Sequence, residues 1–161
     1  MAKIKYPVTA AIRQLKQLKI NYTPHLYPYE EKGGTAVSAR ELGVDEHMIV
    51  KTLVMEDDCR TPLIILMHGD CEVSTKALAR IIGVKRITPC TPAIATKHSG
   101  YQVGGTSPFG TPKTIAVYME QSILSLDTIY INGGKRGFLL SMSPKDVADI
   151  LNAGVVTVAT K

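Results

Sequence analysis

The first apolar positions of the chain repeat with the spacing of an amphipathic helix. Val8, Ile12, Leu15 and Leu18 fall on one helical face, while charged and amide side chains fall on the other. The segment that follows, residues 22–29, contains two prolines, which cannot donate to a β-ladder and therefore suit an edge strand. The pattern predicts a helix that packs on a core, followed by a strand at the border of a sheet.

Later segments mix helical and extended patterns without a regular alternation. Capping residues such as Ser74 and Ser143, and stop signals such as Gly43 and Gly83, mark the helices. The expected helices cover about residues 35–42, 74–82, 91–98 and 143–154, and the expected strands cover residues 50–55, 63–67, 114–119, 128–132, 138–140 and 155–158. We therefore predict a single α+β domain over residues 1–161, with a mixed, barrel-like β-sheet flanked by helices.

Composition places the chain among ordinary folded domains. It has 161 residues, of which 45% are hydrophobic, and this is enough to bury a real core. No apolar run approaches the ~20 residues of a membrane span. The basic N-terminus lacks the apolar region of a secretory signal. We expect a cytoplasmic protein with no membrane partner.

The cysteines and histidines are too scattered to predict a metal centre. Cys59, Cys71 and Cys90 form no close pair, which argues against a disulfide framework or a structural zinc site. His68 and Cys71 are the one suggestive combination, on an expected loop, but a site there needs two further ligands. We expect neither a metal nor a cofactor.

Positive charge gathers near the start of the chain. The net charge is +5, and five cations precede the first acidic residue, Glu30. They are Lys3, Lys5, Arg13, Lys16 and Lys19. This cluster is either the solvated face of the first helix or a surface that contacts phosphate groups.

Two glycine-rich segments could bring backbone close to a ligand. They are residues 104–110, Gly-Gly-Thr-Ser-Pro-Phe-Gly, and residues 133–137, Gly-Gly-Lys-Arg-Gly. Consecutive N–H groups in such loops can hold a carbonyl oxygen or an oxyanion. Neither matches a Walker or a dinucleotide-binding motif. The competing interpretation is that both are turns.

Lys51 stands at the front of an otherwise apolar strand. It could blunt a sheet edge, or it could direct an ammonium group into a pocket. No nucleophile elbow and no Ser-His-Asp set can be assigned. Ser107 is the tempting nucleophile, yet no partner base can be named for it. Hydrolysis by this chain would therefore rely on positioning and electrostatics.

Three segments together carry a resemblance to a known family. They are residues 50–54, 100–110 and 129–137. In this order and spacing, the chain resembles the YbaK-type cysteinyl-tRNA(Pro) deacylases and the related editing domain inserted in bacterial prolyl-tRNA synthetases. Tyr27 and the terminal helices also fit, so the resemblance covers nearly the whole chain.

The resemblance implies a set of site residues. Lys51 is the key site lysine, and the glycine-rich loop binds the aminoacyl end through Gly104, Gly105, Thr106, Ser107, Pro108 and Gly110. Tyr27, Thr52, Asn132 and Gly133 line the pocket. Two positions depart from the branch of the family with the clearest pattern, because Asn132 replaces a serine and Leu139 replaces an acidic residue.

The implied activity is trans-editing hydrolysis of mischarged aminoacyl-tRNA, with cysteinyl-tRNA(Pro) as the leading substrate. A synthetase pocket rejects a similar-sized competitor by only ~1–3 kcal/mol, so a second pocket must clear the errors. A cysteine thiolate could attack its own ester, which explains the missing protein nucleophile. The alternatives are another small amino acid, such as alanyl-tRNA(Pro), and a noncatalytic tRNA- or nucleotide-binding module. The implied partners are the tRNA acceptor end and prolyl-tRNA synthetase.

Overall fold

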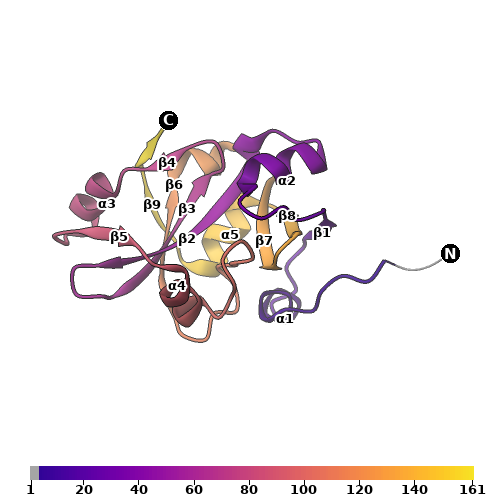
Figure 1. Cartoon of the computed structure of the whole chain (residues 1–161), viewed down its shortest axis with the longest axis horizontal. Helices are drawn as coiled ribbons and strands as arrows, with labels where there is room; N and C mark the ends of the chain where they lie inside the picture. Colours follow the sequence, from indigo (N-terminus) through magenta and orange to yellow (C-terminus); the bar gives the residue numbers. More distant parts are fainter. Residues whose placement is uncertain (1–3) are drawn as a thin grey trace.

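A twisted mixed sheet forms the centre of the protein in the computed structural model, which describes residues 4–161 (Figure 1). The strand order is β1 (Thr23–Leu26), β8 (Phe138–Met142), β7 (Ile129–Lys135), β2 (Ile49–Asp57), β3 (Pro62–His68), β6 (Ala116–Glu120) and β9 (Gly154–Val156), with β5 (Ile87–Pro89) also paired to β2. A separate pair joins β4 (Glu72–Val73) to β10 (Ala159–Thr160). β2–β7, β3–β6 and β6–β9 are parallel and the other pairs are antiparallel, so the predicted mixed α+β sheet is confirmed.

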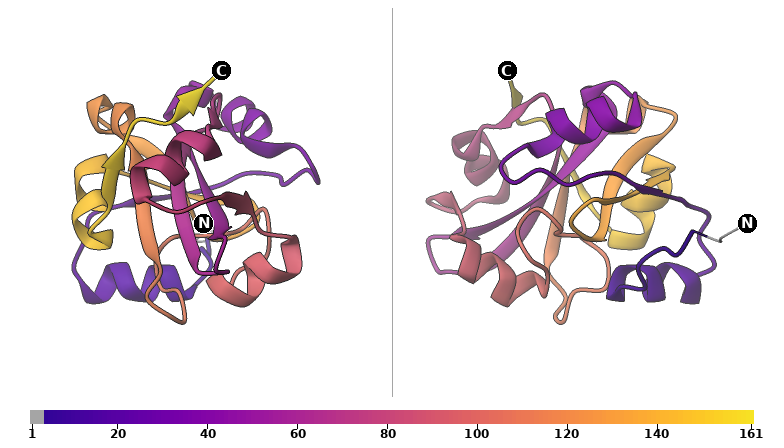
Figure 2. Two further views of the ribbon diagram at one scale, coloured as in Figure 1. Left: turned by 90° about the vertical axis from the view of Figure 1, so that its left-hand side faces the viewer. Right: turned by 45° about the vertical axis from the view of Figure 1, so that its right-hand side comes forward.

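Helices lie on both faces of this sheet (Figure 2). They are α1 (Ala10–Gln17), α2 (Gly34–Leu42), α3 (Thr75–Ile82), α4 (Pro92–Ser99) and α5 (Pro144–Leu151), with short 3₁₀ turns η1 (Glu46–Met48) and η2 (Gln121–Ser125). Local signals set their ends. The side chain of Ser74 accepts a hydrogen bond from the backbone of Ala77, and Gly43 and Gly83 end their helices in the left-handed conformation. None of the helices in residues 4–161 is long and apolar enough to cross a membrane.

Some expected boundaries were wrong. Val8 and Leu18 are 66% and 49% exposed, because Val8 precedes the capping residue Thr9 and Leu18 ends the helix. The turn expected at residues 133–137 starts later, since the first three of these residues continue β7 with an irregular register. The strand expected at residues 155–158 ends earlier, because β9 stops at Val156, and the chain pairs again only in β10, from Ala159.

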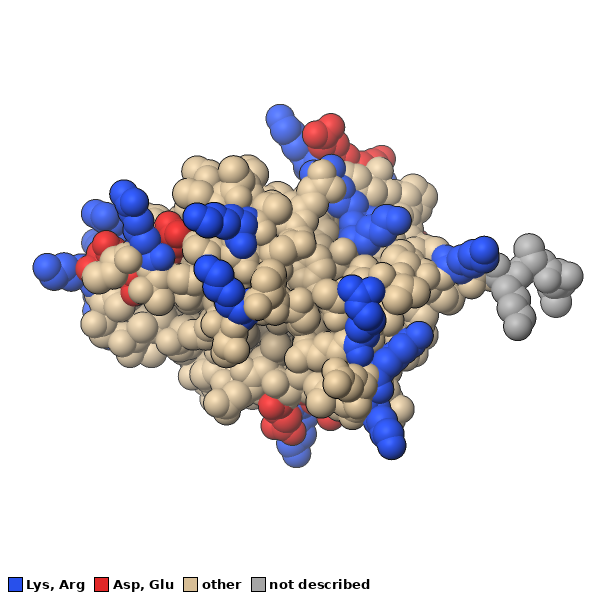
Figure 3. Space-filling model, turned by 90° about the horizontal axis from the view of Figure 1, so that it is seen from below, with Lys and Arg blue, Asp and Glu red and all other residues tan. Residues whose placement is uncertain are grey.

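Basic side chains spread over the side of the molecule that carries α1 and α4, and acidic groups lie mainly near its margins (Figure 3). Arg13 and Lys16 are exposed on α1, on the face opposite the buried Ile12 and Leu15. Lys3 lies outside the described residues. The structure therefore confirms an exposed basic face on the first helix.

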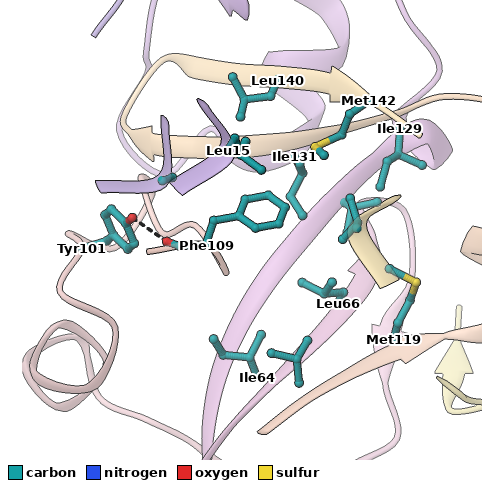
Figure 4. Packing of buried hydrophobic residues seen from close by; sticks show 14 of the residues in the cluster. Leu15, Ile64, Leu66, Tyr101, Phe109, Met119, Ile129, Ile131, Leu140 and Met142 are labelled. Atoms are coloured by element: carbon teal, nitrogen blue, oxygen red, sulfur yellow. Dashed lines mark hydrogen bonds between the residues drawn. The ribbon is translucent and has the colours of Figure 1, made fainter. Parts of the chain in front are cut away.

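Both faces of β3 are buried, which explains its continuous apolar sequence. Ile64 and Leu66 join a core with α1 and α5, whereas Ile65 and Met67 join a second core with Leu78 of α3. The first core also receives side chains from the loop after α4, as Figure 4 shows. The glycine-rich loop is thus part of the packed interior as well as of the surface.

Candidate functional site

A gap in strand pairing exposes part of the central strand β2. β3 pairs with β2 from Val50 to Glu56, but on the other side β7 reaches only Val50 and β5 begins only at Met55. The backbone C=O of Val54 accepts a hydrogen bond from Cys90 on this second side. Because backbone groups alternate sides along a strand, the N–H and C=O of Thr52 also face the gap. Residues 51–54 therefore offer an open strand edge to a ligand.

A cavity of about 820 Å³ lies at this open edge. Segments far apart in the sequence form its walls: the chain between β1 and α2, the middle of β2, the glycine-rich loop and the β7–β8 hairpin. Of the residues predicted for the site, the following line the cavity: Tyr27, Lys51, Thr52, Gly104, Thr106 and Asn132, together with Leu139. The other predicted residues, Gly105, Ser107, Pro108, Gly110 and Gly133, are not among its lining residues.

Lys51 is held at the rim of the cavity. Its Nζ donates to the backbone C=O of Cys71 at 2.5 Å and lies 3.9 Å from a carboxylate oxygen of Glu72. The lysine side chain is 19% exposed, and the glutamate side chain is 77% exposed. Lys51 thus combines the two interpretations of the sequence, because it occupies a locally open strand edge and also lines a cavity.

Thr52 carries a polar group that lacks a partner. Its Oγ1 is buried and makes no hydrogen bond with any of the described residues. Buried hydroxyl groups are nearly always hydrogen-bonded in folded proteins, so each exception needs an explanation. A bound ligand that reaches into the cavity would supply the missing partner.

The glycine-rich loop turns most of its polar groups inward. Ser107 is fully buried, and its Oγ accepts a hydrogen bond from the backbone N–H of Phe109 at 3.2 Å. Phe109 points into the core, where the hydroxyl of Tyr101 donates to its C=O at 2.6 Å (Figure 4). The N–H of Gly110 donates to Gln14 of α1 at 2.6 Å. These contacts fix the path of the loop and leave Ser107 no access to a substrate.

Two N–H groups of this loop stay free for a ligand. The N–H of Gly105 donates to the C=O of Gln102 at 2.8 Å, so it is already used. Gly104 and Thr106 line the cavity, and their backbone N–H groups make no hydrogen bond within residues 4–161. Backbone donors at such positions can stabilise a carbonyl oxygen or an oxyanion.

Gly105 allows the loop to pack closely on the hairpin. A Cβ atom at this position would lie 2.6 Å from the backbone N of Arg136 and 2.8 Å from the backbone carbon of Lys135. No side chain fits at these distances without moving the backbone. The glycine is therefore required by packing between two chain segments rather than by a ligand.

Asn132 joins the same two segments by hydrogen bonds. Its Oδ1 accepts from the N–H of Gly134 at 2.6 Å and of Lys135 at 3.1 Å. Its Nδ2 donates to the C=O of Gly104 at 3.3 Å and of Lys135 at 3.2 Å. The side chain thus holds the irregular end of β7 and attaches the glycine-rich loop to it. Sequence reasoning had assigned Asn132 only to the pocket wall.

Leu139 and Gly133 belong to the apolar support of the site. Leu139 is 4% exposed and packs with Ala39 and Ile49, so an apolar side chain suits this position. A Cβ atom at Gly133 would lie 2.6 Å from the ring of Phe138. These two residues shape the cavity through packing.

Cys90 is a cavity residue that the sequence did not reveal. It follows β5, a three-residue strand too short to recognise from its pattern. Burial, and to a smaller extent the nearby carboxylate of Glu56, raises the pKa of its thiol to about 11. At neutral pH the thiol is therefore protonated and a poor nucleophile.

Among residues 4–161, two groups of side chains have ligand atoms close enough together to hold a metal ion. The ligand atoms of Glu56, Cys90 and His98 lie within 4.8 Å of one another. His98 Nε2 is 2.8 Å from a carboxylate oxygen of Glu56, which is the geometry of a hydrogen-bonded pair.

The second group consists of His47, His68 and Asp70. His68 was paired with Cys71 in the sequence argument, but its ring nitrogens contact the C=O of His47 and the hydroxyl of Ser122, each at 2.7 Å. Hydrogen bonding within the protein thus occupies both nitrogens of His68.

Comparison with known proteins identifies the family. The sequence profile of the aminoacyl-tRNA editing domain matches residues 30–150. EbsC of Enterococcus faecalis, named as a candidate Cys-tRNA(Pro)/Cys-tRNA(Cys) deacylase, is 28% identical over 154 residues, which cover 95% of this chain and 94% of EbsC. A proline–tRNA ligase of Thermodesulfovibrio yellowstonii is 32% identical over 123 residues, which cover 76% of this chain but 20% of the ligase.

Solved structures share the fold. The hypothetical protein APE2540 has a TM-score of 0.87 at 24% identity, covering 94% of this chain and 100% of that structure. A candidate trans-editing enzyme for prolyl-tRNA synthetase has a TM-score of 0.83 at 19% identity, covering 97% of this chain and 100% of that structure. With the profile spanning most of the chain, the protein belongs to the aminoacyl-tRNA editing domain family.

Proposed function

We propose that this protein removes cysteine from Cys-tRNA(Pro) in trans. The similarity to EbsC extends over nearly the full length of both chains, and EbsC is named for this type of activity. The matching ligases carry the corresponding region as about a fifth of their length. This chain would perform in trans the editing step that the resemblance assigns to the domain inserted in prolyl-tRNA synthetases. That function places it in the cytoplasm, where tRNAs are charged.

The observation that carries the proposal is the cavity at the open edge of β2. An aminoacyl ester offers a carbonyl oxygen, an amino group and a short side chain. The cavity provides the ammonium of Lys51, the free N–H groups of Gly104 and Thr106, and the unpaired hydroxyl of Thr52. We assign Lys51 and the two N–H groups to the ester carbonyl and its developing negative charge. Thr52 and the strand edge would position the amino acid.

Among the described residues, the cavity presents no hydroxyl paired with a histidine and no ionised thiol, although the exposed carboxylates of Glu30, Glu31 and Glu72 line it. Within the described part of the chain no histidine lines it, and the thiol of Cys90 is protonated at neutral pH. The nucleophile would then come from the substrate. The cysteine thiolate attacks its own ester carbonyl, the bond to the tRNA 3′-oxygen breaks, and that oxygen leaves with a proton from solvent. Water hydrolyses the resulting cyclic thioester to free cysteine.

A deacylation panel tests this assignment. The purified protein is given cysteinyl-, alanyl- and seryl-tRNA(Pro), with prolyl-tRNA(Pro) as the control, and release of the amino acid is followed under single-turnover conditions. We expect fast release of cysteine only. Equal release of alanine would rule out attack by the substrate thiol and favour a general small-residue deacylase. Binding of tRNA without release of any amino acid would identify a noncatalytic module.

The identity of the tRNA would be read with help from prolyl-tRNA synthetase. The cavity at the open edge of β2 would take the aminoacyl end, and the anticodon lies at the far end of a tRNA. Affinity purification of the protein with and without tRNA checks this. We expect prolyl-tRNA synthetase to be retained in the presence of tRNA. Full discrimination between cysteinyl-tRNA(Pro) and cysteinyl-tRNA(Cys) by the isolated protein would remove the need for the synthetase.

A further inference from the structure

A second hollow adjoins the cavity and shares two of its residues. This hollow, called here the tyrosine groove, has a volume of about 680 Å³. It is lined by Lys5, Tyr6, Pro7, Leu26, Tyr27, Pro28, Lys135, Arg136 and Gly137. Tyr27 and Arg136 also line the cavity, so the two spaces are neighbours that share these residues. An extended ligand that occupies both spaces would contact Tyr27 and Arg136.

The lining of the tyrosine groove combines positive charge with flat apolar surface. Three cations, Lys5, Lys135 and Arg136, contribute to it, and none of its described lining residues is acidic. Tyr6 is 40% exposed and Leu26 is 45% exposed, so large apolar side chains face solvent here. Proteins bind single-stranded nucleic acid with this combination, in which cations follow the phosphates and aromatic rings stack on unpaired bases.

Arg136 is held in place before any ligand arrives. Its Nε donates to the C=O of Val103 at 2.9 Å, and its guanidinium carbon lies 5.0 Å from the centre of the Tyr29 ring. Stacking on an aromatic ring and one fixed hydrogen bond leave the outer N–H groups oriented. A phosphate group passing from the groove to the cavity would meet this prearranged donor.

A third hollow near the cavity provides a contrast. It is lined by the cations Lys76, Arg80, Lys85 and Arg86, and it touches the cavity at Thr75. Its described lining contains no aromatic residue and includes Asp58. Charge alone can bind a phosphate backbone, but it cannot distinguish unpaired from paired bases. The tyrosine groove is the better match for a single strand.

We infer that the tyrosine groove binds the single-stranded 3′ end of the tRNA and leads its terminal aminoacyl ester into the cavity. This inference rests on the proposed function, since it names where the RNA part of the same substrate lies. The phosphates contact Lys5, Lys135 and Arg136, and unpaired bases stack on Tyr6 and Tyr27. The duplex stem remains outside the groove.

Binding of uncharged RNA tests the inference without any ester chemistry. The probes are a hairpin RNA with a short single-stranded 3′ end and the same hairpin with a blunt end, and affinity is measured by fluorescence anisotropy. We expect the wild-type protein to prefer the hairpin with the single-stranded end. The double variant Lys5→Glu/Lys135→Glu should lose this preference, and Tyr6→Ala should reduce it by about fivefold or more, the loss expected for one stacked base. Circular dichroism confirms that each variant is folded.

The matched control is Lys76→Glu/Lys85→Glu, which changes the charge equally in the third hollow. It should keep the preference for the single-stranded end, although it can weaken binding to both hairpins. The inference is overturned if Lys5→Glu/Lys135→Glu keeps the preference, or if the control variant loses it. The proposed function is tested independently, by deacylation of the wild-type protein. Deacylation by wild-type protein with an unchanged preference in Lys5→Glu/Lys135→Glu would refute the groove alone, whereas a preference without deacylation would refute the substrate assignment alone.

Discussion

Individual side chains around the cavity divide into those that face its space and those that hold its walls. Lys51, Thr52 and Tyr27 belong to the first group. Ser107 and Gly105 belong to the second, although they lie in the same loop as Gly104, which lines the cavity. The sequence could show that this loop matters. It could not show which residues turn inward, because that depends on contacts with α1 and the β7–β8 hairpin.

Replacement of Lys51 by methionine should nearly abolish deacylation. Methionine keeps much of the stem of the side chain and removes the charge, so the fold should be retained. Loss of one well-placed electrostatic contact to a developing oxyanion typically lowers the rate by about 10²–10³. Single-turnover deacylation of cysteinyl-tRNA(Pro) measures the effect. Glu72→Gln is the control and should stay active, since Glu72 is exposed and its nearest carboxylate oxygen lies 3.9 Å from the lysine. Near-normal turnover by Lys51→Met would remove the lysine from the mechanism.

Ser107→Ala and Gly105→Val should affect the protein in different ways. Ser107→Ala leaves the buried N–H of Phe109 without its acceptor, which costs about 1–3 kcal/mol of stability, but the cavity is untouched and activity should persist. Gly105→Val forces the loop away from the hairpin, and activity should be lost. Urea unfolding and single-turnover deacylation separate the two effects. An inactive but stable Ser107→Ala, together with an active Gly105→Val, would instead indicate a covalent serine mechanism.

The thiol of Cys90 should react slowly with alkylating agents at neutral pH. Its pKa is raised to about 11 by burial and by Glu56, so the thiolate is only about one part in a thousand near pH 8. The thiolate fraction, and with it the alkylation rate, should rise about tenfold per pH unit until it levels off near the pKa. Iodoacetamide labelling of a Cys59→Ser/Cys71→Ser variant gives this profile. A plateau below about pH 9 would show that Cys90 has an ordinary thiol and could act as a nucleophile.

At the level of secondary structure, the site depends on strands that stop short. β7 and β5 each pair with only part of β2, and the uncovered edge between them faces the cavity. Asn132 completes the arrangement, since it fixes the irregular end of β7 and binds the glycine-rich loop. The cavity is therefore a property of sheet topology as much as of individual residues.

Asn132→Ala should loosen both the hairpin and the loop. The variant loses the acceptor for the N–H groups of Gly134 and Lys135 and the donor to Gly104, at a cost of about 1–3 kcal/mol. Asn132→Asp is the comparison variant, because it keeps the acceptor but places a carboxylate oxygen against the C=O groups of Gly104 and Lys135. We expect both variants to be less stable than wild type in urea unfolding, and we expect faster amide exchange at Gly134 and Lys135 in Asn132→Ala only, because Asn132→Asp keeps their acceptor. Wild-type stability of Asn132→Ala would show that these hydrogen bonds are not important.

Elements with local signals could be predicted, and elements defined by distant partners could not. Capping residues and the apolar period located α3 and α4 to within about a residue, because a helix satisfies its own hydrogen bonds. β5 was missed, since three residues that include a proline become a strand only through pairing with β2. The open edge of β2 was missed for the same reason. Resemblance to the family placed Lys51 and Gly104 at the site, but not Cys90.

In the whole molecule, the cavity lies between two positively charged hollows. The tyrosine groove meets it at Tyr27 and Arg136, and the hollow beside α3 meets it at Thr75. Basic side chains also cover the α1 and α4 side (Figure 3). A net charge of +5 distributed in this way suits a polyanionic substrate that extends well beyond the cavity.

Binding of tRNA should therefore depend steeply on salt. Each phosphate contact releases counterions, so the logarithm of the affinity should fall linearly with the logarithm of the salt concentration, by about 0.7–0.9 per contact. Titrations between about 50 and about 200 mM salt measure the slope. We expect Lys5→Gln/Lys135→Gln to reduce it, since both cations line the tyrosine groove. Arg13→Gln/Lys16→Gln should leave it unchanged, because α1 contributes no lining residue to the cavity or the groove. A smaller slope in the α1 variant would show that the basic face of the first helix contacts phosphate, and an affinity independent of salt would contradict electrostatic binding altogether.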